Sequence, residues 1–136
     1  MFNLAAVKHK NILRKALSNC FEPLKDELGN VPISMQKDKH IAAYILGICR
    51  TYAEIQGLNE TTFNLMVDAA FDELFRRESV EVQTRAETWL QTNDDTFMEA
   101  YYFAKQHTIE NALNLNWLSV HAQKHFKAGH QVMFAL

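Results

Sequence analysis

Residues 34–56 have the sequence SMQKDKHIAAYILGICRTYAEIQ and contain the most apolar run of the chain, from Ile41 to Cys49. The apolar side chains of this stretch recur at helical spacing and cover most of the circumference of a helix. A helix that is apolar on most sides lies inside its domain, so residues 34–56 are predicted to form the central helix. Gly47 lies in its middle, where glycine disfavours helix formation. We therefore expect a neighbouring helix to approach closely at Gly47.

Boundary signals flank the central helix at both ends. Ser34 can cap its N-terminus, and Gly57 fits a left-handed cap at its C-terminus. Asn59 fits the N-cap of the next helix, with Leu58 and Phe63 in the two positions of a hydrophobic staple. The other predicted helices before the fourth long segment span residues 2–21, a short piece from Pro23 to Gly29, and Asn59 to about Arg77. The next helix is capped by Ser79 and ends at Asn93, and the one after it has Thr96 and Glu99 as a capping box. The last helix runs from about Leu115 to Ala128.

The composition favours the same architecture. The chain has 136 residues, near the commonest size of one domain, and contains only four Gly and two Pro. Sandwiches and barrels depend on many tight turns, for which these residues are used, so their scarcity argues against an all-β fold. We predict an all-α fold, a compact bundle of about five or six helices that forms a single helical domain over residues 1–136.

Charge and cysteine content restrict the expected setting. Residues 1–50 carry a net charge of +4 and residues 51–110 a net charge of -8, so these two parts could face each other or a partner. Cys20 and Cys49 lack metal or redox spacing and are predicted to be buried free thiols. No segment has the roughly 20 apolar residues of a membrane span, and no signal peptide is recognisable. We expect a cytoplasmic protein without membrane contact.

One pair of histidines has the spacing of metal ligands. His121 and His125 lie four residues apart on the last predicted helix, which places them on one face. Lys124 between them would repel a cation, and the Glu that zinc peptidases place beside the first His is absent. Two partly exposed histidines beside an apolar stripe explain the pattern equally. A helical metal- or small-ligand-binding protein that uses His121 and His125 is one alternative function, although no cofactor is predicted.

A second alternative comes from residues 52–64, which resemble a helix-turn-helix motif. Gly57 would open the turn between its two helices. Gln56 stands where the motif needs an apolar residue, and the acidic side chains that follow would repel phosphates. Nucleic acid is therefore not the partner we favour. In a small DNA-binding regulator of this kind, the residues facing the DNA groove would be Thr61, Thr62 and Asn64.

Catalytic motifs are missing from the sequence. No nucleophile elbow, phosphate loop or dinucleotide fingerprint is present. Tyr101, Tyr102 and His107 share a predicted helix and could line a pocket, although aromatic residues at helical spacing usually belong to a core. We predict no catalytic residue. The favoured function is a non-catalytic interaction or regulatory module that binds a protein partner or itself, with a homodimer expected.

Two segments supply the candidate partner-binding residues. One is the basic face of the first predicted helix, and the other is the apolar C-terminal tail, which we expect to dock on the core or on another subunit. The residues are Lys8, Lys10, Arg14 and Lys15 on the helix, and Val132, Met133, Phe134 and Leu136 in the tail.

Overall fold

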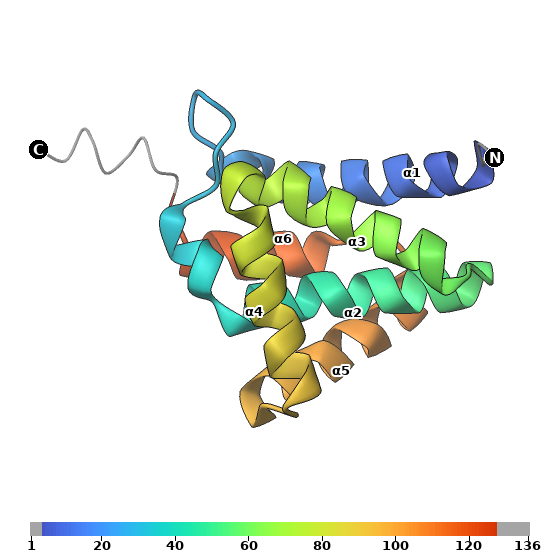
Figure 1. Ribbon diagram of the computed structural model, residues 1–136. Helices are drawn as coiled ribbons and strands as arrows, with labels where there is room; N and C mark the ends of the chain where they lie inside the picture. Colours follow the sequence, from blue (N-terminus) through green and yellow to red (C-terminus); the bar gives the residue numbers. More distant parts are fainter. Residues whose placement is uncertain (1–3, 128–136) are drawn as a thin grey trace, which may run out of the picture.

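The computed structural model of the protein describes residues 4–127, and within this range every regular element is helical (Figure 1). The predicted all-α bundle is therefore confirmed. Six α-helices are joined by loops and by three short 3-10 helices. In chain order the elements are α1 (Leu4–Phe21), η1 (Glu22–Leu24), η2 (Ile33–Lys37), α2 (Lys39–Gln56), α3 (Glu60–Phe75), η3 (Arg76–Glu78), α4 (Ser79–Gln91), α5 (Asp95–Asn111) and α6 (Asn116–His125).

Helix α2 is the central helix, as its apolar pattern predicts. Every residue from Ile41 to Ala53 is buried except Arg50, which is half-buried. The helix packs against α3, α4 and α5. Figure 1 shows α4 crossing in front of α2, with α1 and α3 on one side of it and α5 on the other. The side chains of all six α-helices meet in one core cluster, which includes the fully buried Phe21, Phe71 and Phe97.

Helices α2 and α5 pair side by side and point the same way along their length. An ion pair of 2.8 Å joins Lys39 Nζ to Asp94 Oδ2 where the two helices begin. A second ion pair of 3.1 Å joins Lys105 Nζ to Glu54 Oε1 towards their other ends. Gly47 lies between these two ion pairs. The charged side chains thus bracket the closest contact of the two helices.

Gly47 allows that contact. A Cβ atom at position 47 would lie 2.6 Å from the carbonyl oxygen of Tyr101 and 2.9 Å from Cβ of Ala104. Carbon atoms do not approach a carbonyl oxygen so closely, so any larger residue would force α5 away from α2. The predicted close approach at Gly47 is confirmed.

The junction between α2 and α3 also matches its prediction. Gly57 ends α2 in the left-handed conformation, with φ of 65°, and its N–H donates to the carbonyl groups of Ala53 and Glu54. The Asn59 side chain caps α3 by accepting a 2.8 Å hydrogen bond from the N–H of Thr62. Both residues act locally, which is why the sequence alone identifies them.

Other helix starts were predicted at the wrong residue. Ser34 lies inside η2, and α2 is capped by Asp38, which accepts a 2.9 Å hydrogen bond from the N–H of Ile41. The capping box expected at Thr96 is replaced by Asp94, which accepts from the N–H of Phe97. Asp94 and Thr96 are both possible N-caps of α5. Asp94 also forms an ion pair with Lys39, a contact distant in sequence that favours it as the cap.

Three further boundaries differ from the expectation. Ser79 does not cap α4 but is its first residue, and its hydroxyl donates a 2.5 Å hydrogen bond to Asp72 Oδ1. The short helix expected between Pro23 and Gly29 is reduced to η1, and Leu28 is exposed. Helix α6 ends at His125, before the residue expected. No helix within residues 4–127 is long and apolar enough to cross a membrane.

Candidate functional site

An aromatic cluster joins α5 and α6 to α2. The centroid of the Phe103 ring lies 4.3 Å from that of His107 and 5.7 Å from that of Trp117, and His107 stacks on Trp117 at 5.1 Å. The buried Tyr44 of α2 completes the cluster, 5.8 Å from Phe103 and 5.3 Å from Trp117. These tilted and edge-to-face contacts are the geometries that aromatic pairs prefer. They fix α6 against α2 and α5.

Two polar ring atoms in this cluster lack partners. Nδ1 of His107 and Nε1 of Trp117 are buried, and neither has a hydrogen-bond partner in the part of the chain that the structure describes. A buried polar atom without a partner costs about 1–3 kcal/mol, so it needs an explanation beyond stability. Because the two rings stack, the two unpaired atoms belong to side chains in direct contact.

Large apolar side chains extend the cluster onto the surface. Phe103 is 47% exposed, and Tyr102 and Ile109 on the outer side of α5 are each 60% exposed. Val120, one turn after Trp117 on α6, is 56% exposed. Exposed apolar groups on neighbouring helices are a feature of interaction sites. We call this region the α5–α6 face and define it by Tyr102, Phe103, His107, Ile109, Trp117 and Val120.

The expected grouping of Tyr101, Tyr102 and His107 is only partly present. Tyr102 and His107 belong to the α5–α6 face. Tyr101 is buried on the side of α5 that packs against α2. Tyr101 and Tyr102 point about 100° apart on the helix, and Tyr102 and His107 about 140° apart, so Tyr101 faces α2 while the other two lie on the two flanks of the exposed side.

Three histidine rings lie at the edge of the aromatic cluster. The ring of His121 is 4.4 Å from that of His125, 6.2 Å from that of His40 and 5.1 Å from that of Tyr44. Burial lowers the pKa of His121, and the nearby His125 lowers this pKa further, so the ring is neutral near pH 7. No group of three or more His, Cys, Asp or Glu side chains within residues 4–127 is placed to hold a metal ion. The metal-binding alternative thus depends on His121 and His125 alone.

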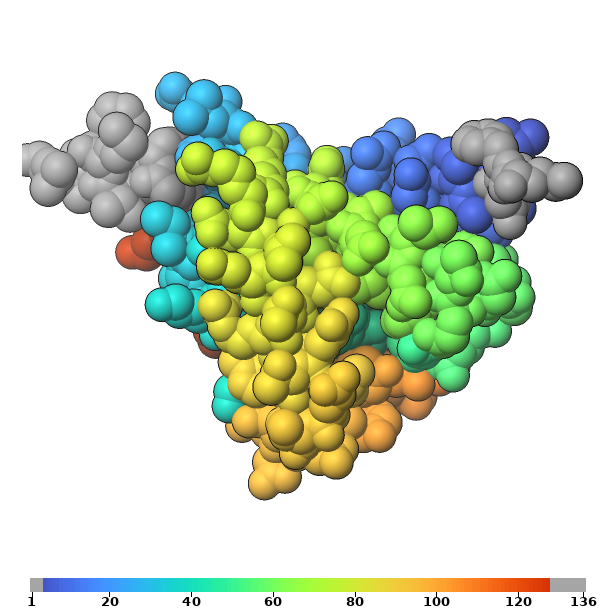
Figure 2. All heavy atoms as spheres, in the orientation of Figure 1, coloured from blue at the N-terminus to red at the C-terminus, as the bar shows by residue number. Residues whose placement is uncertain are grey.

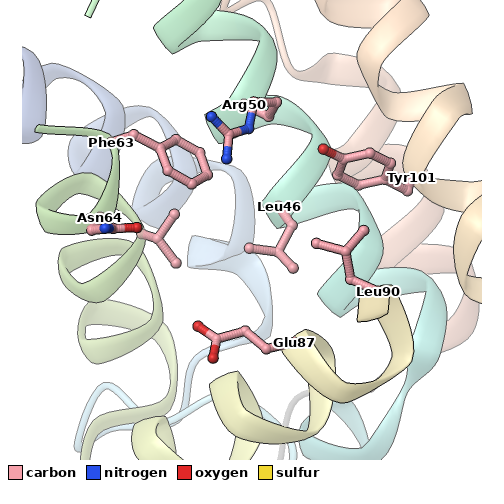
Figure 3. Close-up of a pocket in the computed structure, with 8 residues that line it drawn as sticks. Leu46, Arg50, Phe63, Asn64, Glu87, Leu90 and Tyr101 are labelled. Atoms are coloured by element: carbon pink, nitrogen blue, oxygen red, sulfur yellow. The ribbon is translucent and has the colours of Figure 1, made fainter. Parts of the chain in front are cut away.

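A cleft opens on another side of the bundle, where α2, α3, α4 and α5 meet, and Figure 2 shows this hollow beside α4. Its volume is about 370 Å³ with the open mouth included. Buried Leu46 and Val67 form its floor, and Leu90 and Tyr101 line it from α4 and α5. We call it the Arg50 cleft. Figure 3 shows Arg50 and Glu87 at its two ends, with Leu46 and Leu90 between them.

Arg50 is fixed at its end of the cleft and its charge is balanced there. Its Nη1 donates to Glu60 Oε1 at 2.6 Å, and its guanidinium lies 3.6 Å from the centroid of the Phe63 ring. The hydrogen bond to Glu60 raises the pKa of Arg50. Burial raises the pKa of Tyr101, which keeps its hydroxyl protonated. This end of the cleft therefore offers hydrogen bonds without a net charge.

The other end of the cleft is lined by the acidic Glu87, and Gln83 connects Glu87 to Asp68, which lies beside the cleft and not in its lining. The side-chain amide of Gln83 donates to Asp68 Oδ1 at 2.9 Å and to Glu87 Oε1 at 3.1 Å, and so links α4 to α3. Neither Asp68 nor Glu87 forms an ion pair with another residue between positions 4 and 127. Two carboxylates thus share one neutral amide.

The four residues of the predicted basic face lie on α1. This helix packs against α3, and no carboxylate of the described range forms an ion pair with any of the four. The face is therefore a positive surface without charge compensation. It consists of Lys8, Lys10, Arg14 and Lys15. The tail residues Val132, Met133, Phe134 and Leu136 lie outside the described residues.

The three residues of the helix-turn-helix alternative have different surroundings. Thr62 is buried, whereas Thr61 and Asn64 are exposed. Asn64 lies at the rim of the Arg50 cleft. The ion pair between Arg50 and Glu60 holds α3 against α2 and uses a basic group that a DNA backbone would need.

Both cysteines are free and buried, as predicted. Burial raises the pKa of Cys49 to about 12 and that of Cys20 to about 12. A thiol with so high a pKa carries almost no thiolate at neutral pH, so neither cysteine is suited to nucleophilic attack.

Sequence reasoning did not identify the Arg50 cleft. Its lining comes from four helices, and no two of those helices supply a recognisable motif. One signal was available, because Arg50 is the only charged residue between Ile41 and Ala53. A cation in an otherwise buried stretch needs a partner and an opening to solvent.

Comparisons with family models, with curated proteins and with solved structures find no match to this chain.

Proposed function

We propose that the protein is a non-catalytic interaction module that self-associates through the α5–α6 face. The observation that carries this proposal is the aromatic cluster of Phe103, His107 and Trp117, which continues into exposed apolar side chains on both helices. Aromatic residues at the centre of a patch supply most of the binding energy in protein interfaces. A partner would remove these side chains from water.

A second copy of the chain suits this face better than a charged partner does. The six residues of the α5–α6 face include no Lys, Arg, Asp or Glu. Gln106, between Tyr102 and Ile109 on α5, directs its amide to Glu110. In a two-fold dimer the same patch meets itself, so the six residues themselves add no like-charge repulsion, and the neighbouring Glu110 keeps its hydrogen bond to Gln106. The homodimer expected from the sequence is thus assigned a surface.

The absence of catalysis is also part of the proposal. The raised thiol pKa values disfavour cysteine chemistry, and the histidine rings near His121 contact one another and Tyr44. We further propose a cytoplasmic setting, since two free thiols suit a reducing compartment.

Sedimentation analysis over a range of protein concentrations tests the dimer. The double variant Ile109→Ser/Val120→Ser removes two exposed apolar side chains from the face, and Ile55→Ser/Val80→Ser removes the same two residue types elsewhere. We expect the wild-type chain and the Ile55/Val80 control to dimerise. The face variant should dimerise with a Kd about tenfold higher or more, because each truncated apolar contact costs about 1 kcal/mol.

Two results would refute the proposal. One is a wild-type mass that corresponds to a single chain at every concentration. The other is an equal loss of dimer in both double variants, which would mean that the face has no special part in association. Far-UV circular dichroism of all three proteins checks that each one is folded.

A further inference from the structure

We propose that the Arg50 cleft is a second interaction site, which binds a peptide segment of a protein partner. This segment presents one apolar side chain to the floor of the cleft and a Lys or Arg to the acidic end. The site lies on helices α2, α3, α4 and α5 and uses none of the residues of the α5–α6 face. It therefore does not depend on the dimer proposed above.

The size and lining of the cleft define the first part of the ligand. Leu46 and Val67 are almost fully buried, so the floor is apolar, and Leu90 continues it from α4. Without the open mouth the cleft has a volume of about 70 Å³, well below the roughly 300 Å³ at which pockets begin to hold whole small-molecule ligands. One apolar side chain of a longer segment suits such a space better than a whole cofactor does. Burial of that side chain supplies affinity.

The neutral end of the cleft suits the backbone of a peptide. Arg50 is already paired with Glu60, so a second carboxylate there would gain little. The hydroxyl of Tyr101 points towards Arg50 at this end, and the exposed amide of Asn64 lies at the side of the cleft (Figure 3). Amide and hydroxyl groups donate to and accept from peptide groups. This end favours a neutral backbone over an anionic ligand.

The acidic end selects the charge of the partner. Asp68 and Glu87 stand on different helices, and both accept from the single amide of Gln83. A partner's ammonium or guanidinium group can take the place of this amide and meet both carboxylates. Charge-assisted hydrogen bonds are stronger than neutral ones, so the exchange favours binding. The predicted ligand is therefore a basic, apolar segment, a type that grooves between helices commonly bind.

Three synthetic peptides with a common Ala/Gln host sequence test this assignment. The first carries a central Leu with a Lys one helical turn to either side. In the second both Lys residues are replaced by Glu, and in the third the Leu is replaced by Gln. Amide resonances of 15N-labelled protein report where each peptide binds. We expect only the first peptide to shift resonances around Leu46, Val67 and Leu90, with a Kd that rises with salt.

Variants of the protein supply the controls. Glu87→Gln should weaken the first peptide about two- to fivefold, the range for one exposed ion pair. Glu81→Gln removes an exposed carboxylate from α4 that does not line the cleft and should leave binding unchanged. Glu87→Lys should reverse the preference towards the Glu peptide. Ile109→Ser/Val120→Ser should bind the first peptide normally, which separates this site from the dimer surface.

Clear outcomes overturn the inference. The first is no shift at the cleft with the Leu/Lys peptide at concentrations up to about 1 mM. The second is equal binding of the Lys and Glu peptides, which would remove the role of the acidic end. The third is equal weakening by Glu87→Gln and Glu81→Gln, which would show a general charge effect of α4.

Discussion

Replacement of Gly47 by alanine would add a single methyl group where α2 touches α5. In the native structure this methyl carbon would lie 2.6 Å from the carbonyl oxygen of Tyr101 and 2.9 Å from Cβ of Ala104. The first of these atoms belongs to the backbone, so no side-chain rotation can relieve the clash. Helix α5 must move as a whole, or α2 must bend.

The size of the effect follows from two opposing contributions. Alanine is better than glycine inside a helix by about 0.5–1 kcal/mol, which by itself would stabilise the protein. Insertion of a carbon atom into a tightly packed contact costs about 1–3 kcal/mol. Because the obstacle here is backbone, we expect a cost near the upper half of that range. The net change for Gly47→Ala is a loss of about 1–2 kcal/mol in the free energy of unfolding.

Urea unfolding followed by far-UV circular dichroism measures this change, with the slope of the transition compared between variants. Ala104→Gly and the double variant Gly47→Ala/Ala104→Gly complete a mutant cycle. The double variant removes the contact at 2.9 Å but keeps the one with the Tyr101 carbonyl. We therefore expect a favourable coupling between the two substitutions but only partial recovery.

A gain in stability for Gly47→Ala would refute this reasoning. Such a gain would mean that the two helices do not pack closely at Gly47 and that helix propensity decides the result. The displacement of α5 has a second consequence. Because Tyr101 lines the Arg50 cleft, Gly47→Ala should also weaken binding of the Leu/Lys peptide, whereas a peptide affinity equal to that of the wild type would contradict the expected movement.

Three further predictions concern titrating groups. The hydrogen bond from Lys39, together with that from the N–H of Phe97, lowers the pKa of Asp94 below 3.8, so Asp94→Asn should destabilise the protein at neutral pH and do so less as the pH falls below about 4. A destabilisation in urea unfolding that does not change with pH would contradict this. Burial lowers the pKa of His121 below 6.5, so NMR titration should show its ring protonating at lower pH than in an unfolded chain, and the protein should lose stability as the pH falls below about 6.5. A titration midpoint of His121 above 6.5 would contradict the lowered pKa. Because burial raises the pKa of Cys49 to about 12, a thiol reagent at pH 8 should modify Cys49 only as fast as the protein opens, and modification at the rate of a free thiol would refute its burial.

Features that depend on neighbouring residues could be predicted from the sequence. The run around Ile45 identified the buried helix, and Gly57 and Asn59 marked a helix junction because a left-handed cap and an N-cap use local geometry. Gly47 was informative for a related reason. Glycine in the middle of an apolar helix has few explanations other than a close neighbour.

Features that depend on the packing of several helices could not be predicted. Ser34 and Asp38 are both good cap residues, and local propensity did not select between them. The Arg50 cleft requires α2, α3, α4 and α5 to be positioned together, which no motif reports. Of the α5–α6 face, only Tyr102 and His107 were singled out from the sequence, because the contact of Phe103 with Trp117 joins two different helices.

The parallel pairing of α2 with α5 has a consequence for how the chain is made. Gly47 meets residues 101 to 104, so the tightest helix contact joins segments that leave the ribosome far apart in time. At about 5–20 residues per second, the delay between them is about 3–10 s. During that interval the apolar surface of α2 has only α3 and then α4 to cover it. The nascent chain should therefore be most prone to aggregate, and most in need of a chaperone, until α5 has been synthesised.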